Sequence, residues 1–246
     1  MVDTPSSALS VRARYERLDT DRFTFLDRAR QCAELTLPTL IPPLGHTKTT
    51  KYYTPWQGIG ARGVNTLAAK LLLALLPPNS PFFRLEVDDF TKDKLTGDPN
   101  LGSAVEQGFA KIERAIVSEI ETTGLRAPIF LAFKHLIVGG NAFVYLPAEG
   151  GARVFGLDSF VCRRDAKGNL LEVITKEQID PDTDVKGLLE KMEEGAENED
   201  GKEDEGKRNE KETTEDEDVD VFTRFYLDGN QWKCYQEAFG KVVPDS

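Results

Sequence analysis

The 246-residue sequence is poor in cysteine and histidine, the side chains that bind zinc and act as nucleophile or base. Cys32, Cys162 and Cys234 lie far apart in the sequence. Their spacing predicts neither a disulfide framework nor a metal site, so we expect three reduced thiols. His46 and His135 are too distant from each other to indicate a zinc site or a proton relay. His135 falls on an apolar helix, where we expect a packing residue with its hydrogen bonds satisfied.

Long apolar runs are absent too. The longest candidate, LLLALL at residues 71–76, is closed by two prolines. It falls far short of the ~20 residues that span a bilayer. The N-terminal stretch MVDTPSSALSVRARYERLD lacks the apolar centre of a secretory signal. We therefore expect no membrane contact, and a protein that stays in the cytoplasm or leaves it inside a larger particle.

Sequence motifs of common enzymes are missing. There is no G-x-x-x-x-G-K-[ST] phosphate loop, no H-E-x-x-H and no G-x-S-x-G. Asp88 and Asp89 have no histidine beside them and are expected to be solvated. Arg163, Arg164 and Lys167 surround a predicted turn and could touch phosphate, although exposed hairpin charge is usually solvated. We predict no catalytic, cofactor-binding or metal-binding residue, no cofactor and no enzymatic activity.

Negative charge is concentrated in one segment. The net charge is −11. Residues 190–220 contain 16 acidic and 5 basic side chains, and the rest of the chain carries 26 of each sign. The segment has almost no apolar side chains, so it cannot offset the entropy of ordering its backbone. We predict a disordered acidic insert in a fold that is otherwise neutral.

Apolar spacing of three and four residues predicts a helical N-terminal half. Asp19 and Thr20 are candidate caps for a second helix in the first helical stretch. The helix that follows Thr54 has so wide an apolar face that we expect it to be buried on more than one side. The predicted helical stretches are about Ala8–Leu37, Pro55–Leu76 with Thr54 as N-cap, 101–122, and Arg126–Val138 stopped by Gly139 and Gly140.

Strand patterns dominate after Asn141. Before that point only FFRLEVD, residues 82–88, alternates as a strand. DAKGN at 165–169 predicts the turn of one hairpin, and DGN at 228–230 the turn of a second. The predicted fold class is α+β, with a helical N-terminal half followed by a β-hairpin-rich segment. The predicted division of the chain is 1–189, the acidic insert 190–220, and a returning hairpin at 221–246.

The stretch GIGARG, residues 58–63, matches G-x-G-x-x-G, the pattern that cradles dinucleotide phosphates. That pattern needs a preceding strand and an acidic residue ~20 positions later, and neither is present. A nucleotide-dependent enzyme is therefore the weakest hypothesis. Glycine in a helix costs about 1 kcal/mol relative to alanine, so these residues need another reason. Gly60 and Gly63 share one face with Gly58 near its edge, which predicts close packing against a neighbouring element, anchored by Trp56.

Several blocks of the sequence resemble, in order, the portal (head-to-tail connector) proteins of short-tailed, podovirus-type phages. The blocks run from about Tyr15 to Glu237 and exclude the acidic run. They are YERLDTDRFTFLDRARQCAELTLPTLIP, YTPWQGIGARGVNTLAAKLLLALLPPNSPFFRLEV, FLAFKHLIVGGNAFVYLP, FGLDSFVCRRDAKGNLLEVITKEQI and DVFTRFYLDGNQWKCYQE.

This resemblance implies a structural, non-enzymatic subunit of the virion. Portal proteins form homododecameric rings at one capsid vertex, through which double-stranded DNA is packaged by a terminase and later ejected. Their other partners are capsid and scaffolding proteins and tail adaptor proteins, and assembly takes place in the host cytoplasm. The chain would be the wing region of such a subunit, before the stem, clip and crown. The family is about twice as long, so the chain is expected to be an N-terminal portion or one part of a split protein.

An alternative from another class is a portal-like adaptor, a binding module in head–tail assembly without its own channel.

Overall fold

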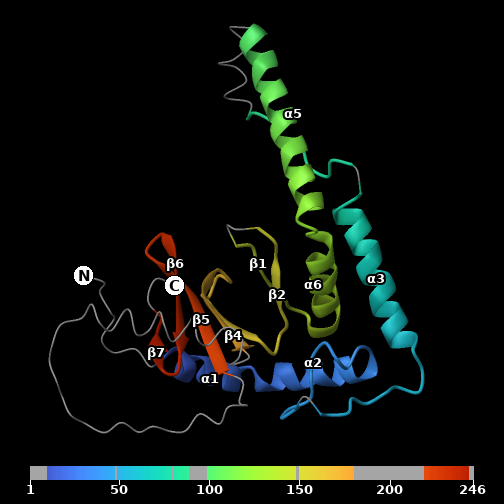
Figure 1. Ribbon diagram of the computed structural model, residues 1–246, viewed down its shortest axis with the longest axis vertical. Coiled ribbons are helices and arrows are strands. Elements are labelled where there is room, and N and C mark those ends of the chain that lie inside the picture. The colour runs from blue at the N-terminus through green and yellow to red at the C-terminus, as the bar shows by residue number, and fades with distance from the viewer. Residues whose placement is uncertain are drawn as a thin grey trace, which may run out of the picture. The chain divides into compact units, whose positions relative to one another are not determined.

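The computed structural model describes residues 10–47, 49–78, 80–88, 99–147, 150–179 and 219–243 (Figure 1). The chain divides into two compact units. The first comprises Met1–Phe25 and Ser159–Ser246, and the second comprises Leu26–Asp158. Helices precede antiparallel strands, so the predicted α+β class is confirmed. Most of the acidic run 190–220 lies outside the described residues, and the three-part division of the chain stays a prediction.

The first unit is built on a five-stranded antiparallel sheet, in the order β3-β4-β5-β6-β7. Both predicted hairpins are confirmed. The side chain of Asp165 accepts the N–H groups of Lys167 and Asn169, each at 2.8 Å, which fixes the turn between β3 and β4. The strands are β3 (Phe160–Arg164), β4 (Leu170–Ile179), β5 (Val219–Asp228), β6 (Gln231–Ala238) and β7 (Lys241–Val242).

Helix α1 (Val11–Asp21) packs on one face of this sheet (Figure 1). The rings of Tyr15 and Phe222 lie 5.4 Å apart between centroids. Residues four apart on α1 share one helix face, and alternate residues of a strand share one sheet face, so these two sets of side chains can pack together. The resulting core contains Val11, Tyr15, Val161, Ile174 and Phe222.

The first helical stretch is broken at Arg22. Helix α1 ends at Asp21 and α2 (Phe23–Leu35) follows. A second helix was predicted, but Asp19 and Thr20 do not cap it, because both lie in the last turn of α1. Instead, Asp19 accepts a hydrogen bond from the Arg22 guanidinium at 2.7 Å, and the same guanidinium donates to the carbonyl of Phe160 at 2.5 Å. A tertiary contact therefore decides where the helix ends.

Within the described residues, the second unit contains most of α2, three further helices and a short hairpin. The predicted helices at 101–122 and 126–138 are confirmed, and Gly140, with φ +75°, ends the second of them in the left-handed region. Helix α3 packs against α6, and α6 packs against β2 (Figure 1). The elements are α3 (Ile59–Leu75), α5 (Pro99–Thr122), α6 (Arg126–Gly139), β1 (Phe143–Tyr145) and β2 (Arg153–Phe155). Their buried core contains Leu26, Ala29, Ala33, Ile41, Val64 and Val138.

The strand predicted for FFRLEVD is wrong. Residues 82–88 are irregular. The N–H of Leu85 donates to the Glu113 carboxylate on α5 at 2.6 Å rather than to a neighbouring strand. Alternation of side chains indicates a strand only where a partner edge is available. No helix within the described ranges is long and apolar enough to cross a membrane.

Candidate assembly surface

The glycine motif begins helix α3 rather than lying inside it. The predicted start at Thr54 and Pro55 is wrong, because α3 begins at Ile59 with Gly58 as its N-cap. The carbonyl of Gly58 accepts the N–H of Arg62 at 3.0 Å. Glycine at 58 and 60 weakens helix propagation. Upstream, the 96% exposed Trp56 supplies no burial to offset this cost, so its predicted anchoring role is not seen in the single chain.

Among the described residues, a close approach is found at one of the three glycines, Gly60. A Cβ at Gly60 would lie 2.6 Å from the carbonyl oxygen of Leu35 and 3.1 Å from Cγ2 of Thr36. Close packing at Gly60 is therefore confirmed, and the neighbour is the end of α2. A Cβ at Gly58 or Gly63 would meet nothing within 4 Å, so close packing at these two positions is not found within the described chain and stays a prediction.

Helix α3 was predicted to be buried on more than one side, but the described chain buries it on one side. Val64 and Ala68 are buried against the core of the second unit. On other sides of the helix, Leu67, Leu73 and Leu75 are exposed, with Leu67 at 47%. An apolar sequence all round a helix indicates cover on several sides. The described chain supplies that cover on one side only.

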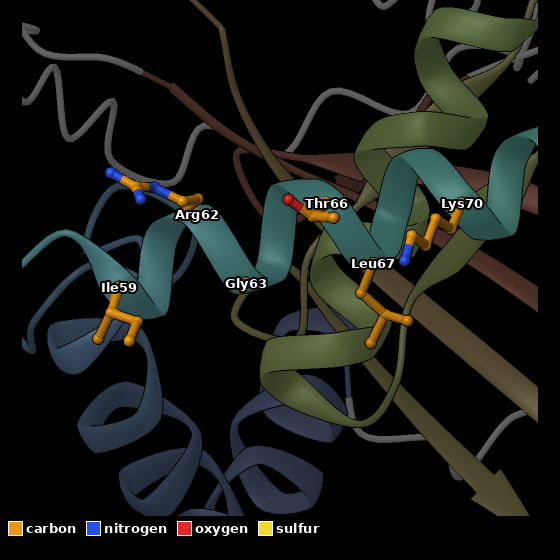
Figure 2. Close-up of a pocket in the computed structure, with 6 residues that line it drawn as sticks. All are labelled: Ile59, Arg62, Gly63, Thr66, Leu67 and Lys70. Carbon is orange, nitrogen blue, oxygen red and sulfur yellow. The ribbon is translucent and has the colours of Figure 1, made fainter.

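The exposed side of α3 carries a groove of about 320 Å³. Figure 2 shows Ile59 and Leu67 pointing to the same side of the helix with Gly63 between them. The missing side chain at Gly63 forms a notch between two apolar walls, the shape into which a side chain of a packing helix fits. We call this surface the α3 exposed face; its residues are Ile59, Arg62, Gly63, Thr66, Leu67 and Lys70.

The groove does not have the walls of a nucleotide site. All of its lining residues come from one helix. A dinucleotide site needs the end of a strand beside the glycine turn, whereas residues 49–57 are irregular. The α3 exposed face is instead an open, mostly apolar surface with cations at Arg62 and Lys70. This composition is typical of a contact with another polypeptide.

Helix α5 also leaves apolar side chains uncovered. Ile112 and Ile116 are exposed, and Ala115 lies beside them. No side chain of α5 whose exposure is described is buried. One edge is held in the unit through Glu113, which accepts the N–H of Leu85. The amphipathic face predicted for 101–122 therefore exists, with Val105, Phe109 and Ile120 partly buried and its middle, at Ile112 and Ile116, left exposed by the described chain.

Arg126 fixes the end of α3 relative to α5 and α6. Its guanidinium donates to the carbonyls of Leu76 and Pro77, the latter at 3.0 Å, and to the Glu121 carboxylate at 2.6 Å. The carbonyls at the end of a helix lack partners within it and carry negative partial charge. A cation there holds the two uncovered helices in a defined arrangement.

His135 is buried on α6, as predicted, but its hydrogen bonding is not as predicted. Its Nδ1 has no hydrogen-bond partner among the described residues. Burial lowers the pKa of His135, and the nearby Asp158 opposes that shift. A Cβ at Gly156 would lie 2.8 Å from Cε1 of His135, so the imidazole packs against glycine backbone. Cys32, Cys162 and Cys234 form no disulfide.

Large apolar side chains are exposed over much of the second unit. Isolated exposed leucines are normal, but monomeric proteins rarely expose many large apolar residues together. The most exposed in this unit include Leu35, Leu44, Trp56, Ile59, Leu73, Leu75 and Leu146. The fold thus leaves large apolar side chains of α3 and α5 exposed.

Comparison with known families identifies the family of the chain. The family model of the bacteriophage head to tail connecting protein matches residues 8–236, and the chain belongs to this family. The resemblance to podovirus-type portal proteins is thereby confirmed.

Curated relatives agree with the family. The chain is 38% identical over 239 residues to the portal protein of Enterobacteria phage T3, and 38% identical over 239 residues to that of Escherichia phage T7. These alignments cover 93% and 94% of the chain, but 41% and 42% of the relatives. The portal protein of Enterobacteria phage SP6 is 35% identical over 161 residues, which are 65% of the chain and 31% of that relative. The chain thus spans about two-fifths of the length of its T3 and T7 relatives.

The exposed face of α3 is the candidate surface that sequence reasoning missed. The signal was present, because the apolar residues of α3 are too many for one buried side. The sequence alone could not show which side of α3 is exposed in the single chain.

Proposed function

We propose that this chain is the wing region of a structural subunit of the phage portal. The subunit forms a homododecameric ring at one capsid vertex and is a virion component assembled in the host cytoplasm. Double-stranded DNA enters and leaves through the ring. Its partners are the terminase, capsid and scaffolding proteins, and tail adaptor proteins. The subunit has a structural role, in which it forms the ring and binds partner proteins, and it carries out no catalysis.

One observation supports self-assembly above the others: α3 has more apolar residues than the described chain buries. The helix is apolar on several sides, yet the described chain covers only the side of Val64 and Ala68. The cost of leaving Ile59 and Leu67 in water is recovered when another surface covers them, at about 25 cal/mol per Å² of apolar area. A ring supplies such a surface from the next copy at every position, because its head-to-tail contact repeats around a closed rotation.

Mass measurement and imaging test this function. The protein, produced with any coding sequence contiguous with it, is examined by mass photometry and negative-stain electron microscopy. We expect a closed ring with a central hole and a mass near twelve subunits. A single monomeric species under conditions that preserve its fold would contradict the proposal. Rings of another copy number would correct the stoichiometry while retaining the portal function.

The adaptor hypothesis makes a different prediction. An adaptor without its own channel would remain monomeric alone and join a ring formed by another protein. The relatives named above are portal proteins, and no observation on this chain favours the adaptor over them.

A further inference from the structure

Three arginines of the first unit share a single carboxylate. Nε and Nη2 of Arg14, on α1, donate to the two oxygens of Glu172, on β4, at 2.6 and 2.7 Å. Nε of Arg224, on β5, donates to the same carboxylate at 2.6 Å. Nε of Arg163, on β3, lies 3.5 Å from it. These residues form what we call the arginine cluster, drawn from one helix and three adjacent strands.

The carboxylate lies beneath the guanidinium groups. The Glu172 side chain is 1% exposed, Arg224 11%, Arg14 25% and Arg163 52%. The arginines therefore stand between the carboxylate and the solvent. Three positive charges against one negative charge leave a surplus of two. Like charges held together repel one another, and partial burial strengthens the repulsion by lowering the local dielectric.

Within the described part of the chain, several N–H donors of the cluster have no acceptor. A guanidinium carries five N–H donors in a planar fork. Arg14 uses two of its nitrogens on Glu172. The separation of 3.5 Å at Arg163 is too long for a good hydrogen bond, and its guanidinium donates to no acceptor within the described residues. Free donors and surplus charge occur at the same place.

The second side of Arg224 is occupied by neutral groups. Nη1 of Arg224 donates to the hydroxyl of Tyr235 at 2.9 Å, and its guanidinium lies 4.6 Å from the ring centroid of Tyr226. The two rings hold the arginine in place without adding negative charge. Two described carboxylates of the same sheet have partners of their own, because Asp165 accepts hydrogen bonds within its turn and Asp228 pairs with Lys233 at 2.5 Å.

We propose that Arg14, Arg163 and Arg224, oriented by Glu172, bind a dianionic phosphate group. A phosphate dianion balances a surplus of two charges, whereas a carboxylate of a partner protein would balance one. Its oxygens also point in several directions and can accept from more than one guanidinium, and a guanidinium matches phosphate with paired hydrogen bonds. Glu172 is a positioning residue, since it touches the arginines and lies beneath them. Two sources carry this chemistry, inorganic phosphate and a phosphate monoester.

Binding titrations with small anions test this site. Inorganic phosphate, phenyl phosphate and dimethyl phosphate are titrated by calorimetry at pH 7.5, with chloride used to hold the ionic strength constant. Inorganic phosphate, phenyl phosphate or both are expected to bind saturably, and the tighter of the two identifies the source. Dimethyl phosphate, a monoanionic diester, is expected to bind at least about tenfold more weakly. Equal binding of the diester would overturn the proposal, and so would the absence of saturable binding by either dianion.

Substitution of Arg163 separates this site from a general effect of anions. Arg163 is half exposed and only weakly engaged with Glu172, so Arg163→Met leaves the fold in place, which an unchanged melting temperature in chloride confirms. The variant is expected to bind phosphate roughly tenfold or more weakly, the loss typical of one hydrogen bond between charged groups. Arg163→Lys keeps the positive charge but loses the planar set of guanidinium donors, so its affinity for phosphate is expected to lie between those of the parent and Arg163→Met. The control Arg12→Gln removes an exposed arginine that pairs with Glu16 on the outside of α1, and it is expected to bind as the parent does. Equal affinity of Arg163→Met and the parent would overturn the proposal.

Discussion

Glu237 at the end of β6 accepts the backbone N–H of Val11 at the start of α1, with Oε2 and N separated by 2.7 Å. Its Oε1 also lies 3.4 Å from the N–H of Arg12. The first N–H groups of a helix have no partner within it and carry positive partial charge. A buried carboxylate from the sheet therefore caps α1, in addition to the local cap from the Ser10 hydroxyl to the N–H of Ala13.

Removing this long-range cap is expected to destabilise the first unit. Glu237→Gln keeps the size of the side chain but loses the charge and one acceptor oxygen, which should lower the free energy of unfolding by about 1–2 kcal/mol. Urea unfolding followed by circular dichroism measures the change. Glu16→Gln, at an exposed position on α1, serves as the matched control and should alter the stability by less than about 0.5 kcal/mol. Equal losses in the two variants would contradict the capping role.

Acid should weaken the contact between α1 and the sheet through Glu172. Burial raises the pKa of this carboxyl, but hydrogen bonds from Arg14 and Arg224 outweigh it, so the pKa lies below its ordinary value of 4.5. A carboxyl with a lowered pKa contributes stability that is fully present above its unfolded pKa and is lost as the pH falls through the folded pKa.

The test is to measure how the free energy of unfolding changes with pH in the parent and in Glu172→Gln. We expect the free energy of unfolding of the parent to fall as the pH is lowered below about 4.5. Glu172→Gln removes part of that slope and costs roughly 3 kcal/mol at neutral pH, because it leaves the partly buried Arg14 and Arg224 without their buried counterion. Identical slopes for the parent and the variant below pH 4.5 would show that Glu172 does not carry this pH dependence.

Two glycines on α3 should respond oppositely to alanine. In Gly60→Ala the new Cβ would lie 2.6 Å from the Leu35 carbonyl, and a backbone atom yields little, so we expect a loss of about 1–3 kcal/mol. In Gly63→Ala the Cβ meets nothing within 4 Å, so the better helix propensity of alanine should raise stability by about 0.5–1 kcal/mol. Thermal melts of the two variants side by side measure the contrast. A loss at both positions would mean that Gly63 is also packed.

A charge on the α3 exposed face should prevent assembly without unfolding the chain. Leu67→Glu places a carboxylate where an apolar contact is expected, so the ring population measured by mass photometry should fall at least about tenfold. Since Leu67 is half exposed, the melting temperature of the single chain should change little. Leu227→Glu, at the tip of the β5–β6 hairpin in the first unit, is the control and should assemble normally. Normal rings from Leu67→Glu would exclude this face from the contact.

Elements defined by local signals could be predicted from the sequence. The hairpin at 165–169 follows from a turn in which Asp165 satisfies neighbouring N–H groups, and Gly140 marks the end of α6 by adopting a positive φ. Helix α5 follows from apolar residues at helical spacing. In each case the information lies within a few residues of the element itself.

Features decided by distant contacts could not be predicted in this way. Arg14 and Glu172 lie 158 residues apart, and neither belongs to a pattern that points to the other. The predicted start of the third helix at Pro55 followed local capping preferences, but the absence of burial around Trp56 outweighed them. The strand predicted at 82–88 had the right alternation and no strand edge to join.

The first unit is made from both ends of the described chain, with the second unit inserted between α1 and β3. Synthesis proceeds from the N-terminus, so all of Leu26–Asp158 leaves the ribosome before the sheet that α1 packs against exists. Glu172 and Glu237, which hold α1, are translated later still. The nascent chain therefore carries α1 without its sheet until β3–β6 have been made, and the cap of α1 is complete only when Glu237 of β6 is in place.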